Sequence, residues 1–363
     1  MLPFLMNLET WCGFGPLTPK CIRFWRMILP FKTARGPINY GRGGGEAMIV
    51  VRKPGVQATI QDLGRYGYQA LGFASGGAVD ALAYRWANAL VGNAPEAAAI
   101  EIVLQGGEWS FEESTWVAVT GAVCEVVVND KERLPAWSAF WVQAGSTVRL
   151  GKFTGVYAYL AVRGGCAVPT VMGSRSTDLV AGIGGYAGRA LQAGDKIPVG
   201  STALDDWAYR RMLRRAPMLC QDILAPVRLL AGPHDEVMGE NLWTKFFSQE
   251  FVVGADSNRM GIRLQGTFRP APLAPMISEG MAPGAVQITP DGTALVLLPA
   301  RGTLGGYPVV AMVATVDLGR LAQIKPGRKV RFEWVSRETS RQLWEQAVLA
   351  IHDRNVREEA RED

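Results

Sequence analysis

Residues 59–80 read TIQDLGRYGYQALGFASGGAVD, and no other stretch of the chain is as informative about its structure. Asp62, Arg65 and Asp80 stand here among glycines and two tyrosines. Glycine lets the backbone turn sharply, and short polar side chains stabilise such turns. A core strand or helix would show a regular apolar period instead. The stretch therefore predicts loops that fold around a polar pocket.

The whole chain has the composition of a globular protein with room for two cores. It has 363 residues, of which 48% are apolar and 20% are charged,. The net charge is +5, but residues 1–47 carry six Lys or Arg against two Glu, so the remainder is close to neutral. A nucleic-acid-binding protein normally concentrates positive charge on its body. We therefore expect no nucleic acid among the partners.

Cysteine and histidine are too sparse for a metal centre. The five cysteines show no CxxC spacing, and His234 and His352 are the only histidines. This pattern predicts neither a zinc site, nor a disulfide framework, nor a Ser–His triad. Scattered cysteines fit a reducing cytoplasm.

The sequence shows no membrane or export signal. No apolar run reaches the roughly 18 to 20 residues that a membrane span needs, and prolines and charges interrupt residues 1–47,. We expect residues 1–47 to be a poorly ordered extension of a cytoplasmic protein. Translation starts either at Met1 or at Met48. Met48 is a candidate because the codons for Gly43–Glu46, just upstream of it, must be purine-rich like a bacterial ribosome-binding site.

Short apolar runs cut by Gly, Asn and Pro predict a mainly β fold with a few short helices. Asn129-Asp130 predicts a hairpin turn. One helix interrupts the strands over residues 81–91, with Asp80 as its N-cap and Gly92 as its stop. The predicted strands include the runs at 116–119, 123–128, 140–142 and 156–162.

The domain organisation follows from where these patterns change. The alternation of Val330, Phe332 and Trp334 predicts one last strand, and Ser336 can cap a final helix. A glycine turn that leads into a strand occurs in both halves, which favours two similar barrels. The predicted parts are the extension (1–47), a first β-rich body (48–205), a basic connector (206–225), a second β-rich body (226–335) and a C-terminal helix with a charged tail (336–363).

Several short motifs of cofactor chemistry are missing from the sequence. It has no GxxxxGK[ST] phosphate loop, no GxGxxG, no GxSxG and no lysine between methionines that could carry biotin,. Nucleotide or carrier chemistry therefore has to come from another chain.

The remaining candidates are polar residues in glycine-rich turns. Arginines beside exposed backbone N–H groups suit a carboxylate, a carbamoyl group or an amide-derived oxyanion. Asp80 is either a helix cap or a catalyst. Asp62 and Arg65 are either functional or a structural ion pair, and the same two alternatives hold for Asp195 with a nearby arginine. Glu279 lies in a Pro/Gly-rich loop without regular period, which favours function. We interpret His234 as a loop residue.

In order along the chain, these blocks resemble the C-subunit proteins of 5-oxoprolinase, also called KipA-like. That family shares the allophanate hydrolase subunit 2 domain and part of the carboxyltransferase region of urea carboxylase. The resemblance runs from about residue 49 to 332. It rests on TIQDLGRYGYQALG, GGAVD, AVRGG, MGSRST, GGYAGRALQAGD, SNRMGIRLQG, SEGMAPGAVQITPDG and GTLGGYPVV.

The resemblance implies two cyclophilin-like β-barrel subdomains and a function within a complex. The partners it implies are a KipI-like B subunit and a LamB/YcsF-like A subunit, which together open 5-oxoproline, a small cyclic amide, to glutamate with ATP. Combined with the turn positions, it gives Asp62 and Glu279 as catalytic candidates. The candidates for substrate or anion binding are Arg65, Arg175, Arg189, Arg259, Gln287, Arg301 and Tyr307, and no metal ligand is predicted.

The chain departs from the family pattern at several polar positions. Hydrogen-bonding side chains usual in the family are replaced, while the turn glycines and arginines stay. The sequence is thus identified as a divergent member. The replaced positions are Gly76, Asp178, His234, Asn258, Ala300, Gly302 and Leu304.

The sequence is also compatible with two other functions. One is biotin-dependent carboxyl transfer to a urea-like amide, which needs a biotin-carrying partner. The other is a non-catalytic KipA-like regulator that binds a KipI-like kinase inhibitor, a role that tolerates the polar losses.

Overall fold

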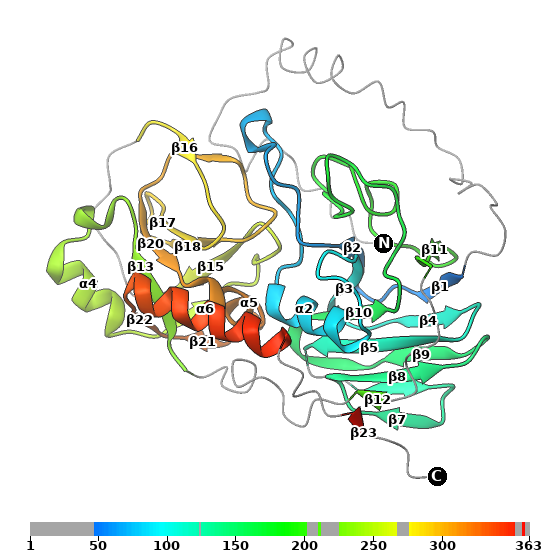
Figure 1. The fold of residues 1–363 in the computed structure, drawn as a ribbon. Coiled ribbons are helices and arrows are strands. Elements are labelled where there is room, and N and C mark those ends of the chain that lie inside the picture. The colour runs from blue at the N-terminus through cyan, green and yellow to red at the C-terminus, as the bar shows by residue number, and fades with distance from the viewer. Residues whose placement is uncertain are drawn as a thin grey trace. The chain divides into compact units, whose positions relative to one another are not determined.

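The computed structural model describes residues 47–122, 125–201, 210–211, 225–266, 276–352 and 358–359. These residues form mainly β structure with few helices (Figure 1), which confirms the predicted fold class. Residues 1–46 and most of 206–225 lie outside the described residues, so the extension, the start site and the connector stay predictions. The domain boundaries also stay predictions.

The first β body consists of two antiparallel sheets that share an apolar core. One sheet has the order β11-β1-β4-β9-β6-β7, and the other has the order β2-β3-β10-β5-β8. The strands are β1 (Met48–Lys53), β2 (Gln57–Gln61), β3 (Ala99–Gln105), β4 (Glu108–Phe111), β5 (Thr115–Gly121), β6 (Val126–Val128), β7 (Glu132–Leu134), β8 (Ser138–Val142), β9 (Thr147–Leu150), β10 (Lys152–Val162) and β11 (Lys196–Pro198).

Strand β10 is buried on both faces, as its apolar run predicts. Ala158, Leu160 and Val162 enter the core between the two sheets. Tyr157 and Tyr159 point the other way, into a core shared with helix α2 (Ala81–Leu90) and with the second β body. Side chains alternate between the two faces of a strand, so one strand contributes to two cores.

The second β body is an eight-stranded sheet that comes close to closing on itself. Its order is β21-β14-β15-β18-β17-β20-β13-β22, and a short pair, β16-β19, lies beside it. The strands are β13 (Val227–Ala231), β14 (Phe251–Val253), β15 (Gly261–Gln265), β16 (Glu279–Gly280), β17 (Ala285–Ile288), β18 (Ala294–Leu297), β19 (Leu304–Gly305), β20 (Val309–Val313), β21 (Lys329–Val330) and β22 (Phe332–Trp334).

The prediction of one last strand through Val330, Phe332 and Trp334 was wrong in one respect. The chain forms two strands there, because β21 pairs with β14 at one edge of the sheet and β22 pairs in parallel with β13 at the other. Only Arg331 separates these strands. One segment thus serves both edges and makes the sheet barrel-like, a closure that removes unpaired edges.

The local predictions for turns and caps are confirmed. The Asp80 side chain accepts a hydrogen bond from Ala83 N at 3.0 Å at the start of α2. Asn129 and Asp130 have φ of 51° and 55° between β6 and β7, which is the geometry of a type I′ hairpin,. Ser336 Oγ accepts from Thr339 N at 3.1 Å at the start of α6 (Arg337–His352).

The helices pack against the sheets and against one another. Helix α2 packs against β5 and β10 and contacts α5 (Thr315–Ala322) and α6. The other helical elements are η2 (Gln69–Leu71), η3 (Asp235–Val237) and α4 (Gly239–Phe247), and β12 (Arg210–Arg211) pairs with β23 (Glu358–Glu359). None of the helices described is long and apolar enough to cross a membrane.

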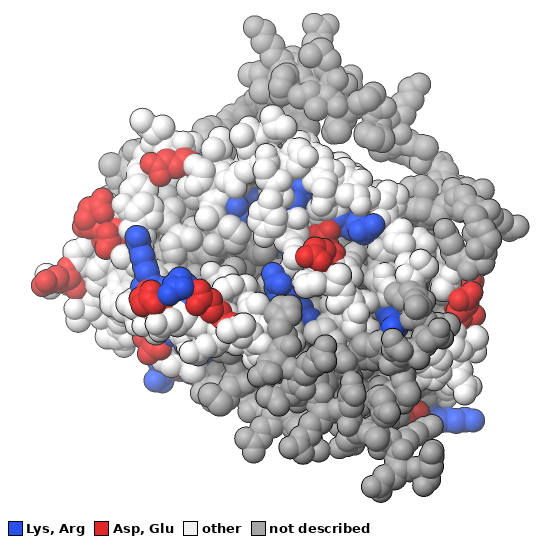
Figure 2. Space-filling view, viewed as in Figure 1, with Lys and Arg blue, Asp and Glu red and all other residues white. Residues whose placement is uncertain are grey.

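Charges of both signs are interspersed on the face shown in Figure 2. Among the described residues visible there, Lys and Arg lie close to Asp and Glu, and no broad patch of one sign forms.

Candidate functional site

Asp62 holds the glycine-rich loop after β2 against the segment 174–176. Its carboxylate accepts hydrogen bonds from Ser174 Oγ at 2.7 Å and from Gly64 N at 2.8 Å. Ser176 Oγ and Arg175 N donate to it as well. The side chain is only 7% exposed. Its acceptor sites are therefore occupied by the protein itself.

Arg65 is buried beside this carboxylate but bonds to backbone oxygens. Its guanidinium donates to Val171 O at 3.1 Å and to Ser176 O at 3.0 Å. Burial lowers the pKa of Arg65, and Nη1 has no hydrogen-bond partner among the described residues. Asp62 and Arg65 thus brace the same loops.

Two other predicted anion-binding arginines have protein partners. Arg189 forms a bidentate ion pair with Asp195, with N–O distances of 2.7 and 2.8 Å. Asp195 thus forms the ion pair that is one of the two alternatives for this residue. Arg175 donates through Nε to Val168 O at 2.9 Å.

Arg259 joins the second β body to the first. Its guanidinium contacts the carboxylate of Glu101, a fully buried residue of β3, and donates to Gly77 O at 2.8 Å. The other oxygen of Glu101 accepts from Val79 N at 2.9 Å and from Tyr159 Oη at 2.8 Å. Burial lowers the pKa of Arg259 to about 10. The result is a buried ion pair between residues that are far apart in the sequence.

A second arginine bridges the bodies at a group that we call the Arg301 junction, consisting of Gln69, Ser75, Met281 and Arg301. Arg301 donates to Met281 O at 2.8 Å, to Ser75 Oγ at 3.1 Å and to Gln69 Oε1 at 3.2 Å. The amide of Gln69 donates in turn to Met281 O at 2.8 Å. Arg301 is 3% exposed, and burial lowers its pKa to about 10.

Glu279 and Tyr307 lie on the rim of the same region and remain accessible. Glu279 belongs to β16, which pairs with β19, and its side chain is half exposed. Tyr307 is 40% exposed, and its carbonyl accepts from Gln287 Nε2 at 3.0 Å. Of the predicted site residues, these two are the ones whose side chains face solvent most openly.

His234 lies in the loop between β13 and η3, as predicted, but it also contacts Glu279. Its Nδ1 accepts from Val309 N at 3.2 Å, and Nε2 is 3.7 Å from Glu279 Oε2. The imidazole is therefore fixed in orientation and faces a carboxylate. No local pattern indicates this pair, because the two residues are far apart along the chain.

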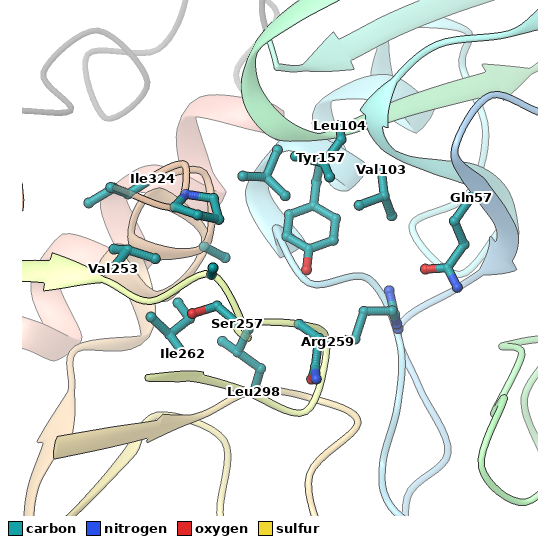
Figure 3. A pocket seen from close by; sticks show the side chains of 15 residues that line it. Gln57, Val103, Leu104, Tyr157, Val253, Ser257, Arg259, Ile262, Leu298 and Ile324 are labelled. Atoms are coloured by element: carbon teal, nitrogen blue, oxygen red, sulfur yellow. The ribbon is translucent and has the colours of Figure 1, made fainter. Parts of the chain in front are cut away.

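Two cavities adjoin these residues. One, of about 160 Å³, lies between the β bodies and is shown in Figure 3. The other, of about 270 Å³, is lined in part by Asp62, Ser75, Gly76, Asp80 and Trp344. Both are smaller than the roughly 300 to 1,000 Å³ of usual small-molecule sites, which leaves little room for a group as large as ATP. Among the described residues no cluster of acidic, His or Cys side chains could hold a metal ion.

The departures from the family pattern lie in different parts of the site: Gly76 lines the second cavity, whereas Asn258 lines the first. Gly76 has φ +59°, and a Cβ there would meet no atom within 4 Å. Asn258 Oδ1 accepts from Met260 N at 2.7 Å, so the amide fills an acceptor role that a carboxylate would also fill. Leu304 is 64% exposed.

Sequence reasoning missed Gln69, Ser75 and Glu101 as members of the site. Glu101 carried a signal, because it is a charged residue inside the apolar strand run Ala99–Ile102. A charge in such a strand needs a buried partner. The identity of that partner, Arg259, was not encoded locally.

The two β bodies together belong to the class of carboxyltransferase-domain proteins. The family model for the carboxyltransferase domain, subdomain A and B, matches residues 71–334. The chain is 36% identical over 289 residues to the C subunit of 5-oxoprolinase from Haemophilus influenzae and covers 91% of it. It is 35% identical over 317 residues to the Escherichia coli protein of that name and covers 100% of it.

Solved structures agree with this assignment. The Kluyveromyces lactis urea amidolyase superposes with a TM-score of 0.76 at 29% identity, over 87% of this chain and 20% of that one. TTHA0988 superposes with a TM-score of 0.71 at 30% identity, over 82% of this chain and 57% of the other. The chain thus spans little more than half of TTHA0988 and a fifth of the amidolyase. It belongs to the family of 5-oxoprolinase C subunits and urea carboxylase carboxyltransferase domains, as the sequence motifs indicate.

Proposed function

We propose that this chain is the C-like subunit of an ATP-dependent complex that hydrolyses 5-oxoproline, or a related small amide, to glutamate. The observation that carries the proposal is the match to a whole subunit. The chain covers 100% of one 5-oxoprolinase C subunit, but only 18% of the Lachancea kluyveri urea amidolyase. The alignment thus spans a whole 5-oxoprolinase C subunit, but only a small part of the amidolyase.

The proposal includes a KipI-like B subunit and a LamB/YcsF-like A subunit in the cytoplasm. ATP would be bound outside this chain. Two observations support that division: the sequence has no phosphate loop, and Arg189, Arg259 and Arg301 already bond to acceptors within the protein. Guanidinium groups engaged in this way are poor phosphate ligands.

We assign the residues different roles within the composite site. Lactam opening adds water to the carbonyl carbon and delivers a proton to the departing nitrogen. Glu279 is half exposed beside His234, so it is the candidate for moving that proton,. Asp62 and Arg65 are buried in loop contacts and act as positioning residues. The Arg301 junction positions the rim between the two β bodies.

Coexpression with the cognate A and B subunits tests the proposal. Purified complex should release glutamate from 5-oxoproline only with ATP and only when this chain is present. Glu279→Gln should lower glutamate release, whereas Glu236→Gln on the exposed turn η3 should leave it unchanged. Glutamate release that does not depend on this chain would refute the proposal.

Carboxyl transfer to a urea-like amide is the second candidate. It is favoured by the TM-score of 0.74 with the Kluyveromyces lactis urea carboxylase. It needs biotin on a partner chain, since this sequence has no lysine between methionines that could carry the group. Urea-dependent transfer from a carboxybiotinyl carrier, without 5-oxoproline turnover, would replace the first proposal. Tight binding to the B-like partner without any turnover would instead indicate a KipA-like regulator.

A further inference from the structure

Arg85 of helix α2 lines the second cavity without a bonding partner of its own. It is partly buried, and the protein encloses its Nε, which makes no hydrogen bond. Among the described residues no carboxylate forms an ion pair with Arg85, and no oxygen accepts a hydrogen bond from it. Polar groups withdrawn from water normally bond to an acceptor, because their lost hydration is otherwise not replaced. Arg85 can therefore offer its donors to a ligand.

The arginines that the sequence predicts to bind an anion are engaged elsewhere. Each of them bonds to an acceptor of the protein itself, and these residues are Arg65, Arg175, Arg189, Arg259 and Arg301. Among the described residues that line the second cavity, Arg85 is the only Lys or Arg. It is therefore the cation best placed to meet an anionic group in this cavity.

The two carboxylates of the second cavity do not neutralise Arg85. Donors of Gly64 and of the segment 174–176 bond to Asp62. Asp80 accepts from Ala83 N at 3.0 Å and from Gln323 Nε2 at 2.9 Å. Burial also raises the pKa of Asp80, which disfavours its charged form,. The positive charge of Arg85 thus remains available to a ligand.

The rest of the lining suits a small molecule with an apolar body. Pro283, Pro299, Leu318 and Trp344 contribute apolar surface to the wall. Tyr66 lines the same cavity and is 72% exposed, so the cavity has an edge at the molecular surface. The volume of about 270 Å³ lies just below the usual range of small-molecule sites and limits the occupant to a compact one,.

Ser75 connects this cavity with the part of the chain that carries Glu279. It lines the cavity, and its Oγ accepts from Arg301 Nη1 at 3.1 Å. Arg301 also donates to the carbonyl of Met281, which follows Glu279 in the chain by two residues. The Arg301 junction therefore lies between the cavity with Arg85 and the candidate for proton transfer.

We propose that Arg85 is a specificity-determining residue, which binds the carboxylate of a compact cyclic acid through charge-assisted hydrogen bonds while the apolar wall packs against the ring. The inference rests on the proposed function for the identity of the acid, 5-oxoproline. Opening of the lactam leaves this carboxylate unchanged, so Arg85 would hold the substrate and the product alike. Such uniform binding lowers KM without raising kcat.

Calorimetric titration of the complex with its cognate A and B subunits, in the absence of ATP, measures the affinity. Wild type should bind 5-oxoproline more tightly than 2-pyrrolidinone, which is the same ring without the carboxylate. Arg85→Gln should weaken binding of 5-oxoproline about ten- to hundredfold, as expected for loss of a hydrogen bond between charged groups. It should leave binding of 2-pyrrolidinone unchanged.

Two variants control for charge and for folding. Arg85→Lys should keep part of the affinity, because lysine retains the charge but lacks the planar fork of donors. Arg52→Gln is the matched control and should bind like wild type, since Arg52 donates to Ser110 Oγ on β4 and lines neither cavity. Arg85→Gln should also unfold at the same temperature as wild type, because Arg85 has no hydrogen bond to lose among the described residues.

Turnover separates this inference from the proposed function. In a complex that releases glutamate, Arg85→Gln should raise KM for 5-oxoproline by the same factor and change kcat little. Binding of 5-oxoproline through Arg85 without any glutamate release would refute the proposed function and leave the carboxylate site standing. Three results would overturn the inference: unchanged affinity in Arg85→Gln, equal affinity of wild type for both lactams, or no binding of 5-oxoproline to wild type.

Discussion

Glu101 and Arg259 form an ion pair across the two β bodies, and both side chains are at least nine-tenths buried. A buried pair contributes little net stability when intact, because desolvation offsets the attraction between the charges. Loss of one partner is costly, since it leaves the other charge uncompensated. The pair therefore favours the one arrangement of the β bodies in which both buried charges are compensated.

Glu101→Gln should destabilise the chain by about 3 to 5 kcal/mol, the usual cost of leaving a buried charge unpaired. Urea unfolding measures this change. Glu101→Gln combined with Arg259→Met should recover part of the loss, because no lone charge remains. The exposed pair Lys53–Glu108 provides the control, and Glu108→Gln should change stability by less than about 1 kcal/mol,. Equal effects of Glu101→Gln and Glu108→Gln would contradict this account.

Arg301→Lys should lower glutamate release by the complex at least about tenfold, since a misplaced rim loses the correct geometry for the substrate. Lysine keeps the charge but cannot reach Met281 O, Ser75 Oγ and Gln69 Oε1 at once, because it lacks the planar fork of donors,. Arg331→Lys, in an exposed pair with Glu250, is the matched control and should be neutral. Full activity of Arg301→Lys would show that the junction does not position the site.

Asp62→Asn should destabilise the chain by about 1 to 3 kcal/mol. Asparagine replaces one acceptor oxygen by an NH2 group, which is a donor. This group would face donors that now bond to the carboxylate, which come from Gly64, Ser174, Arg175 and Ser176. Asp130→Asn is the control, because asparagine tolerates the same positive φ in the hairpin,. Thermal unfolding of both variants decides the matter, and indistinguishable midpoints would rule out a positioning role for Asp62.

The buried carboxylate of Asp317 predicts a specific dependence of stability on pH. Burial opposes ionisation, but hydrogen bonds from Arg228 and the charge of Arg320 outweigh it and lower the pKa of Asp317 below its ordinary 3.8. Because the folded pKa is depressed, the stabilisation is complete above the ordinary value and is lost as pH falls through the folded pKa.

Asp317→Asn should therefore be less stable than wild type at pH 7, and the difference should shrink below about pH 4. Urea unfolding across this range measures the difference. The exposed Asp256–Arg263 pair supplies a control. Asp256→Asn should differ from wild type only slightly in free energy of unfolding at every pH,. A gap for Asp317→Asn that stays constant down to about pH 3 would contradict the linkage.

Alanine variants of Gly184 and Gly182 distinguish two costs of an added Cβ, which are backbone strain and steric clash. Both have positive φ, 68° and 66°, so alanine costs about 1 to 2 kcal/mol at either position,. A Cβ on Gly184 would also collide with Ser176 O and press on Arg65, whereas one on Gly182 meets nothing within 4 Å. Gly184→Ala should thus be clearly less stable than Gly182→Ala in thermal unfolding, and equal midpoints would disprove this close packing.

Sequence and structure agree best where a feature is local. The cap at Asp80, the turn at Asn129-Asp130 and the cap at Ser336 involve residues close in sequence, so residue type and spacing were enough to predict them. The last strand was predicted only in part. Its alternation was visible, but the division into β21 and β22 depends on two partner strands at opposite edges of one sheet.

The amino-acid sequence by itself determined the mainly β fold, the family and the glycine-rich turns that carry the arginines. Only the tertiary structure decided what those arginines bond to. Arg259 meets Glu101 and Arg301 meets Ser75 through packing of the two β bodies, although the residues of each pair are more than a hundred positions apart in the chain. Local propensity cannot encode such partners, because a buried charge specifies that a partner must exist, whereas the packing of the whole core specifies which residue it is.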